Sequence, residues 1–151
     1  MVIYRISRTK FINDLSGEGA KLYGGRWNRP GVPMLYTSQA RSLALLELIV
    51  HFNASSALQL DYSFLSLSVP DAYVIDIEEN IFAETNINLS TEMFLKLSEE
   101  YFSKKNVMAL RVPSVIIPQE FNVLLNPLHV NFSKIKIQRI EPIFLDKRLK
   151  V

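Results

Sequence analysis

Residues 43–50 read Leu-Ala-Leu-Leu-Glu-Leu-Ile-Val, and this stretch decides how the chain is expected to fold. Its apolar residues follow helical spacing around so much of the circumference that they predict a helix covered by protein on most sides. The one polar side chain, Glu47, would then face either the core or a cleft. Because a buried carboxylate is costly without a partner, we expect a nearby group to hold its charge.

The best candidate partner by charge is Arg26, in the sequence Gly-Gly-Arg-Trp-Asn at residues 24–28. Glycine lets the backbone approach closely here, and Trp27 could stack on whatever binds. We therefore expect an ion pair between Arg26 and Glu47, and such pairs often mark a functional site. Plainer interpretations stay open for both residues. Glu47 could belong to an ion pair that only stabilises the fold, or its carboxylate could reach solvent. Arg26 could be an ordinary surface cation.

The composition is that of one compact domain over residues 1–151, since 48% of the 151 residues are hydrophobic and 11% are aromatic. The net charge of +2 is too small for a protein that coats nucleic acid, so direct nucleic-acid binding is not expected. The absence of cysteine excludes disulfides, thiolate metal sites and a cysteine nucleophile. No apolar run approaches the roughly 20 residues that span a bilayer, which predicts a cytoplasmic protein with no membrane attachment.

The pattern on both sides of residues 43–50 mixes strands and helices. Strands are predicted at 2–7, 34–37, 61–69, 73–77, 107–112, 114–117, 122–125 and 134–144, with a helical turn at 10–15 and a glycine-bearing loop at 21–33. Helices are predicted at 39–52, with Ser38 as N-cap and Asn53 near the end, and at 91–104, amphipathic and on the outside. These elements indicate an α+β domain with a mixed or antiparallel sheet.

Three further residue types are candidates for chemistry. Tyr36 lies just ahead of the predicted helix, so its ring belongs either to the core or to a crevice shared with Glu47. Ser114 alone is most simply a strand-edge hydroxyl, because no nucleophile-elbow motif surrounds it. His51 and His129 have no ligand cluster beside them, so no metal site is predicted.

Six short motifs, taken in order, resemble the RES domain family over nearly the whole chain. They are Tyr-Arg-Ile-Ser at 4–7, Gly-Gly-Arg-Trp-Asn at 24–28, Leu-Tyr-Thr-Ser at 35–38, Leu-Leu-Glu at 45–47, Arg-Val-Pro-Ser at 111–114 and Asn-Val-Leu-Leu-Asn-Pro at 122–127. The arginine, glutamate and serine that give the family its name correspond to Arg26, Glu47 and Ser114. Each motif alone is weak, and their common order makes the resemblance specific.

The resemblance implies a bacterial toxin of a type II toxin-antitoxin pair, with a fold similar to ADP-ribosyltransferases and an activity that depletes cellular NAD. The partner would be an Xre-type helix-turn-helix antitoxin, and NAD would be the substrate, without a further cofactor or a metal. Carried over residue by residue, the catalytic set would be Arg26, Tyr36 and Glu47. The remaining residues of the same cleft would be Arg5, Trp27, Ser114 and Asn122.

Each of these residues has an expected role under the resemblance. Glu47 would stabilise the oxocarbenium-like ribose as its bond to nicotinamide breaks, Arg26 would hold the phosphates or ribose, and Tyr36 would stack on nicotinamide. Ser114 would orient Arg26 or a ribose hydroxyl, and Asn122 would fix the loop or the substrate amide. Water, inorganic phosphate or a side chain of a host protein could accept the ribosyl group. A non-enzymatic protein-interaction domain is the alternative from another class.

Overall fold

The computed structural model describes residues 1–50, 61–77, 90–104 and 106–144. Its strands are β1 (Val2–Arg8), β2 (Leu35–Ser38), β3 (Tyr62–Ser68), β4 (Val74–Asp76), β5 (Ala109–Pro113), β6 (Phe121–Leu125) and β7 (Lys136–Pro142). Its helices are α1 (Glu18–Tyr23), α2 (Arg41–Val50) and α4 (Thr91–Phe102), with 3-10 turns at Thr9–Phe11, Asp71–Tyr73 and Phe132–Lys134. None of the described helices is both long and apolar enough to cross a bilayer.

The described strands form one seven-stranded sheet in the order β4-β5-β6-β2-β1-β3-β7. Neighbouring strands are antiparallel, except that β4 and β5 are parallel. The predicted α+β class with a mixed sheet is therefore confirmed. The predicted strands at 61–69 and 73–77 follow each other in the chain as β3 and β4, yet they lie in distant parts of the sheet.

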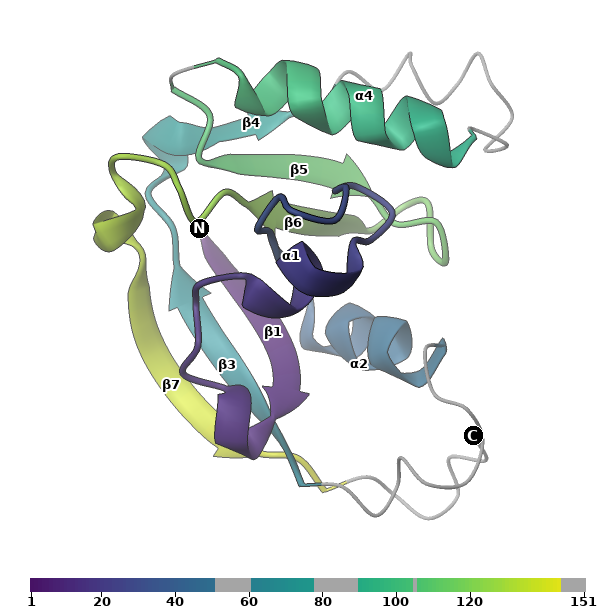
Figure 1. The fold of residues 1–151 in the computed structure, drawn as a ribbon. Helices are drawn as coiled ribbons and strands as arrows, with labels where there is room; N and C mark the ends of the chain where they lie inside the picture. Colours follow the sequence, from purple (N-terminus) through teal and green to yellow (C-terminus); the bar gives the residue numbers. More distant parts are fainter. Residues whose placement is uncertain (51–60, 78–89, 105, 145–151) are drawn as a thin grey trace.

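The sheet changes direction where β1 meets β2. β1 pairs with β3 along its whole length, from Val2 opposite Ser68 to Arg8 opposite Tyr62, whereas it pairs with β2 at Tyr4 and Ser38. Figure 1 shows the result: β1, β3 and β7 lie side by side with β3 antiparallel to the other two, and β5 lies across them next to α4. α2 packs against both β1 and β2 at this junction.

The buried apolar residues form two core clusters. The first runs through both parts of the sheet, since it joins Ile3 of β1 and Leu65 of β3 to Val123 and Leu125 of β6. In the second, Phe94 of α4 packs with Leu110 and Leu124, which alternate along β5 and β6 with residues of the first cluster. Fully burying one such side chain contributes about 1.5–3 kcal/mol, so the sheet is firmly held on both of its faces at β5 and β6.

The amphipathic character predicted for α4 is confirmed. Its buried residues are Phe94, Leu95, Ser98 and Tyr101, while Leu97 is half-buried. The exposed face carries the acidic side chains Glu92 and Glu99, which make ion pairs with Arg29 of the loop after α1. The helix therefore covers the sheet with one face and meets solvent with the other.

The prediction that the helix after residue 38 is covered on most sides is wrong. Only Leu43 and Ala44 of α2 are buried, and Val50 is 59% exposed. The reason is that one side of the helix, with Ala44, Glu47 and Leu48, faces a cavity instead of the core. The end predicted around His51 and Asn53 lies outside the described residues.

Ser38 is not the N-cap of α2, contrary to the sequence prediction. It is the last residue of β2, and its hydroxyl donates to Oδ1 of Asn122. The helix begins at Arg41, and its early backbone hydrogen bond runs from Ala44 to the carbonyl of Ala40. The chain thus makes a further turn between strand and helix before the helical bonds begin.

Two other local predictions are corrected. The loop predicted at 21–33 begins inside α1, a six-residue helix whose flanking residues Gly17 and Gly24 give no helical signal. The strand predicted at 114–117 is an irregular loop, because the Ser114 hydroxyl accepts hydrogen bonds from the backbone amides of Ile116 and Ile117. Such local bonds compete with a strand ladder.

Candidate active site

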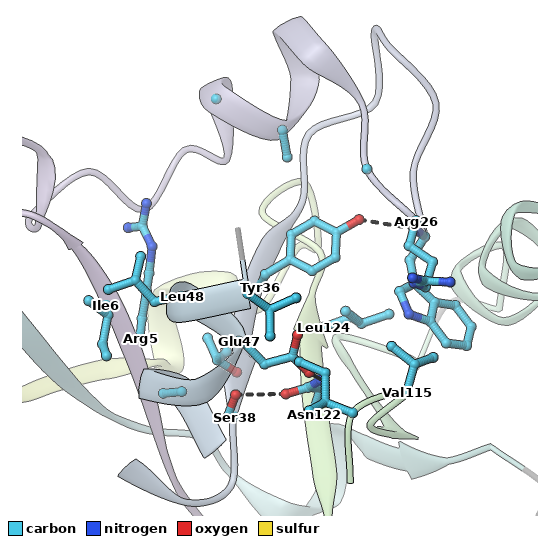
Figure 2. A pocket seen from close by; sticks show the side chains of 18 of the residues that line it. Arg5, Ile6, Arg26, Tyr36, Ser38, Glu47, Leu48, Val115, Asn122 and Leu124 are labelled. Carbon is cyan, nitrogen blue, oxygen red and sulfur yellow. Dashed lines mark hydrogen bonds between the residues drawn. The ribbon is translucent and has the colours of Figure 1, made fainter. Parts of the chain in front are cut away.

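The junction of the sheet holds a cavity of about 780 Å³, within the size range of small-molecule sites. Its walls come from β1, β2, β6, α2 and the loop after α1. Six of the seven residues predicted for the site line it: Arg5, Arg26, Trp27, Tyr36, Glu47 and Asn122. Ser114 is not among the lining residues, but its hydroxyl donates a hydrogen bond to Glu47, which is one of them. The structure therefore brings all seven together at one place, and Figure 2 shows five of them: Arg5, Arg26, Tyr36, Glu47 and Asn122.

The Glu47 carboxylate is anchored through one of its oxygens. Nδ2 of Asn122 donates to Oε1 at 2.6 Å, and Oγ of Ser114 donates to the same oxygen at 3.0 Å. Among the described residues nothing donates to Oε2, and the side chain lines the cavity. The carboxylate is thus oriented by neutral donors and keeps one oxygen available for a ligand.

Both donors to Glu47 are themselves held in place. Oγ of Ser38 donates to Oδ1 of Asn122 at 2.6 Å, which turns the amide so that its NH₂ group faces the carboxylate (Figure 2). Ser114 accepts two backbone amides of its own loop. Sequence reasoning missed this use of Ser38, and no spacing could have shown it, because Ser38 and Asn122 are 84 positions apart.

The predicted ion pair between Arg26 and Glu47 is not formed. Of the salt bridges among described residues none includes Arg26, whose guanidinium carbon lies 5.4 Å from the centre of the Phe94 ring. Figure 2 shows the Arg26 side chain set apart from Glu47 across the pocket. The two opposite charges therefore face one cavity from different walls, an arrangement that leaves room for a ligand between them.

The Tyr36 side chain forms a wall of the cavity while its hydroxyl is engaged behind it. The hydroxyl donates to Oδ1 of Asn28 at 2.7 Å and accepts from the backbone amide of Trp27 at 3.1 Å. Burial raises the pKa of Tyr36 to about 12, and the positive charge of Arg26 opposes that rise. Tyr36 is therefore a neutral phenol near neutral pH, and its ring rather than its hydroxyl is available to a ligand.

Replacing Tyr36 with phenylalanine is expected to change how stability depends on alkaline pH. The pKa of Tyr36 rises from 10.0 to about 12 on folding, so the phenol deprotonates first in the unfolded chain. Between these two values the unfolded state is favoured as pH rises, and the parent loses stability there. At neutral pH the Tyr36→Phe variant should be less stable than the parent, because it lacks the hydrogen bonds of the hydroxyl. Urea unfolding should show that this difference in the free energy of unfolding becomes smaller as pH rises between the two pKa values. A difference that stays constant over this pH range would contradict the raised pKa.

Arg5 supplies a second cation on the β1 side of the cavity. Its guanidinium donates to the backbone carbonyl of Asp14 at 2.5 Å. Burial lowers the pKa of Arg5, and the negative charge of Asp14 opposes that shift. A guanidinium stays charged at physiological pH even so, and this one lies where an anionic group of a ligand could meet it.

Trp27 is a buried wall of the site and not an open stacking surface. Its side chain is 4% exposed, and its ring meets Phe94 at an angle of 64° with 4.8 Å between ring centres. The expectation that it stacks on a ligand is therefore corrected to a packing role. The Arg26 guanidinium lies over the Phe94 ring, against which the indole of Trp27 packs.

Within the described ranges, no group of three or more His, Cys, Asp and Glu side chains could hold a metal ion. His129 lies away from the cavity, where its Nδ1 accepts from the backbone amide of Asn131 and its ring tilts against Tyr73. His51 lies outside the described residues.

An anchored carboxylate, a neutral aromatic wall and cations on two other walls define a site for a small, charged organic molecule. Comparison with known proteins shows that the model of the RES domain family matches residues 2–146. The chain belongs to the RES domain family.

Two curated relatives are toxins. The chain is 36% identical over 137 residues to "Toxin Res" of Photorhabdus laumondii, covering 89% of this chain and 86% of the relative. It is 34% identical over 147 residues to the "Prs ADP-ribosylating toxin" of Sphingobium sp., covering 95% and 91%. The fold also matches the crystal structure of the Mycobacterium tuberculosis MbcT-MbcA toxin-antitoxin complex, with a TM-score of 0.75 at 18% identity over 94% of this chain and 83% of that one.

Proposed function

We propose that this chain is the toxin of a toxin-antitoxin pair and that it depletes NAD by cleaving the bond between nicotinamide and ribose. The observation that carries the proposal is the Glu47 carboxylate, anchored through Oε1 and open at Oε2, in a cavity that also presents Arg26. The name of the Sphingobium relative, an ADP-ribosylating toxin, supports chemistry on the same bond. This activity also agrees with the expected fold likeness to ADP-ribosyltransferases.

The chemistry of the bond suits a single carboxylate. Breaking it builds positive charge on the ribose, and a fixed negative group stabilises that charge more in the transition state than in the ground state. Ordinary glycosidases need a second carboxyl group to protonate the leaving oxygen. Nicotinamide leaves as a neutral ring without a proton, and Glu47 is the one acid among the described residues that line the cavity.

The charges around Glu47 suit the rest of a dinucleotide. Arg26 and Arg5 lie on different walls, and a guanidinium binds phosphate oxygens through paired hydrogen bonds. The flat Tyr36 ring offers a face on which nicotinamide can stack. In this assignment Ser114 and Asn122 hold Glu47 instead of touching Arg26 or the substrate amide, which revises the roles expected for them.

Three reactions are possible, and they differ in what accepts the ribosyl group: water in hydrolysis, phosphate in phosphorolysis, or a side chain of a host protein in ADP-ribosyl transfer. The name of the Sphingobium relative, an ADP-ribosylating toxin, is the reason to include transfer. We expect the purified chain to release nicotinamide from NAD. Mass spectrometry of reactions with and without phosphate would show free ADP-ribose if water is the acceptor and its 1-phosphate if phosphate is, and a labelled protein band would show transfer.

The toxin role is tested in cells. Expression of the chain should lower NAD and arrest growth, and co-expression of the partner encoded beside it, an Xre-type antitoxin in this proposal, should relieve both. The similar MbcT-MbcA structure is that of a toxin-antitoxin complex, which supports an antitoxin partner. Growth arrest without loss of NAD, or no arrest at all, would reject NAD depletion as the toxic activity. A labelled protein band would then indicate transfer to a host protein, and neither a labelled band nor released nicotinamide would indicate a non-enzymatic interaction domain.

A further inference from the structure

The loop that carries Arg26 is fixed to β2 through a single phenol oxygen. On one side of Arg26, the backbone amide of Trp27 donates to the Tyr36 hydroxyl at 3.1 Å. On the other side, Gly25 passes so close that a Cβ there would lie 2.4 Å from the same oxygen. Both neighbours of Arg26 thus contact one atom, so the position of that atom sets the position of the Arg26 backbone.

Asn28 fixes this phenol oxygen from behind the cavity. The Tyr36 hydroxyl donates to Oδ1 of Asn28 at 2.7 Å. The amide NH₂ group donates to the carbonyls of Ala20 and Val32, each at 2.8 Å, and to that of Arg29 at 3.2 Å. Since carbonyls only accept, they hold the amide in one orientation, with its oxygen toward Tyr36. Asn28 is 3% exposed and is not among the described residues that line the cavity.

The loop is held from its other side by α4. The hydroxyl of Ser98, itself buried, donates to the backbone carbonyl of Trp27. Trp27 packs edge-on against Phe94 of the same helix. The residues that flank Arg26 are therefore fixed between β2 and α4, and the arginine side chain projects between these supports.

We propose that Asn28 is a positioning residue of the active site, which acts on the substrate only through Tyr36 and Arg26. By fixing the phenol it places both the aromatic wall and the cation before the substrate arrives. Preorganising a charged group in this way lowers the cost of binding. The proposal rests on the proposed function, because it assigns to Arg26 the anionic part of NAD.

The kinetic test is a double-mutant cycle between Asn28 and Arg26. Asn28→Ala should raise the KM for NAD by about tenfold with a much smaller change in kcat, because it loosens Arg26 and leaves Glu47 in place. In a chain that already carries Arg26→Ala, the same change should have a clearly smaller effect, because only the part that acts through Tyr36 remains. An equal loss in both backgrounds would overturn the proposal, since it would mean that Asn28 does not act through Arg26.

Trp27 provides a second readout that does not depend on activity, because it is the only tryptophan of the chain. Its backbone amide donates to the Tyr36 hydroxyl that Asn28 holds, and its indole is buried against Phe94. Asn28→Ala should therefore loosen Trp27, shift its fluorescence emission to longer wavelength and increase its quenching by acrylamide. A matched control is Ser63→Ala on β3, which changes a buried side chain and removes its hydrogen bond to Thr9 after β1, and which should leave the emission unchanged. Parental emission and quenching in Asn28→Ala would overturn the proposal.

Tyr36→Phe keeps the proposal testable if Asn28→Ala does not fold. It removes the shared oxygen and retains the ring, so it should shift Trp27 emission and raise KM in the same direction as Asn28→Ala. Unchanged emission and KM would overturn the proposal. If the parent chain releases no nicotinamide, the proposed function fails, while the fluorescence comparison still decides whether Asn28 holds the loop.

Discussion

Glu47→Gln is expected to lower the rate of NAD cleavage by about a hundred- to a thousand-fold, the size of effect seen when one preorganised electrostatic group is lost. The change should leave the fold intact, because the amide oxygen of glutamine can accept the same hydrogen bonds from Asn122 and Ser114 that Oε1 accepts. Only the negative charge is removed. The loss should therefore appear in kcat, since the charge acts chiefly on the transition state.

The matched control for this change is Glu100→Gln on α4, at a side chain that is 68% exposed. It alters the same chemical group away from the cavity and should leave the rate at the parental value. Thermal unfolding of Glu47→Gln within a few degrees of the parent would show that the fold is kept. Parental NAD cleavage by a folded Glu47→Gln chain would remove the catalytic role assigned to this residue.

Arg26→Ala is expected to lower kcat/KM for NAD by about a hundredfold, mostly through KM, because it removes charge-assisted hydrogen bonds to the substrate. Arg26→Lys should recover only part of the loss. A lysine keeps the charge but lacks the planar fork that binds phosphate oxygens in pairs and that lies flat on an aromatic ring. The contact of the guanidinium with Phe94 would be lost as well.

Steady-state kinetics of both variants test this assignment. Arg139→Ala is the control, since its side chain is 69% exposed and lies on β7, away from the cavity. Full activity of Arg26→Lys would mean that charge alone is needed and that the fork geometry plays no part. Unchanged KM in Arg26→Ala would place the anionic part of the substrate elsewhere, and Arg5 would be the next candidate to test.

The sequence predicted the parts of the fold that depend on local patterns. β1, β2, β3 and α4 lie close to their predicted ranges, because alternation and helical periodicity are local properties. The short helix α1 was missed, since glycines at both of its ends hide it. The strand expected at 114–117 failed for the opposite reason: an apolar run looks like a strand, but one serine hydroxyl turns the backbone.

The residues predicted for the site lie around one cavity, and some of them have other neighbours than the sequence suggested. Glu47 and Arg26 do face one cavity, yet the carboxylate is held by Ser114 and Asn122, which are 67 and 75 positions away. Charge suggested Arg26 as the partner, and only the sheet register could show otherwise. The register places Asn122 of β6 opposite Ser38 of β2, and this pairing turns the amide toward Glu47.

The divergence of β1 from β2 explains why the site lies where it does. The strands meet at Tyr4 and Ser38, and beyond this pair residues of both strands line the cavity: Arg5 and Ile6 of β1, and Tyr36 and Thr37 of β2. One core cluster runs through both parts of the sheet, from Ile3 of β1 to Leu125 of β6, and holds the diverging strands in place. The anchored carboxylate and the arginine loop then approach the cavity from different elements, so the fold itself holds the charges apart until a ligand lies between them.

The most direct measurement is the release of nicotinamide from NAD that is labelled in the nicotinamide ring, with the purified chain and its Glu47→Gln variant side by side. The parent should release labelled nicotinamide over many turnovers, and the variant should release almost none. Intact NAD with the folded parent, or equal release by both chains, would contradict the claim that this carboxylate breaks the bond.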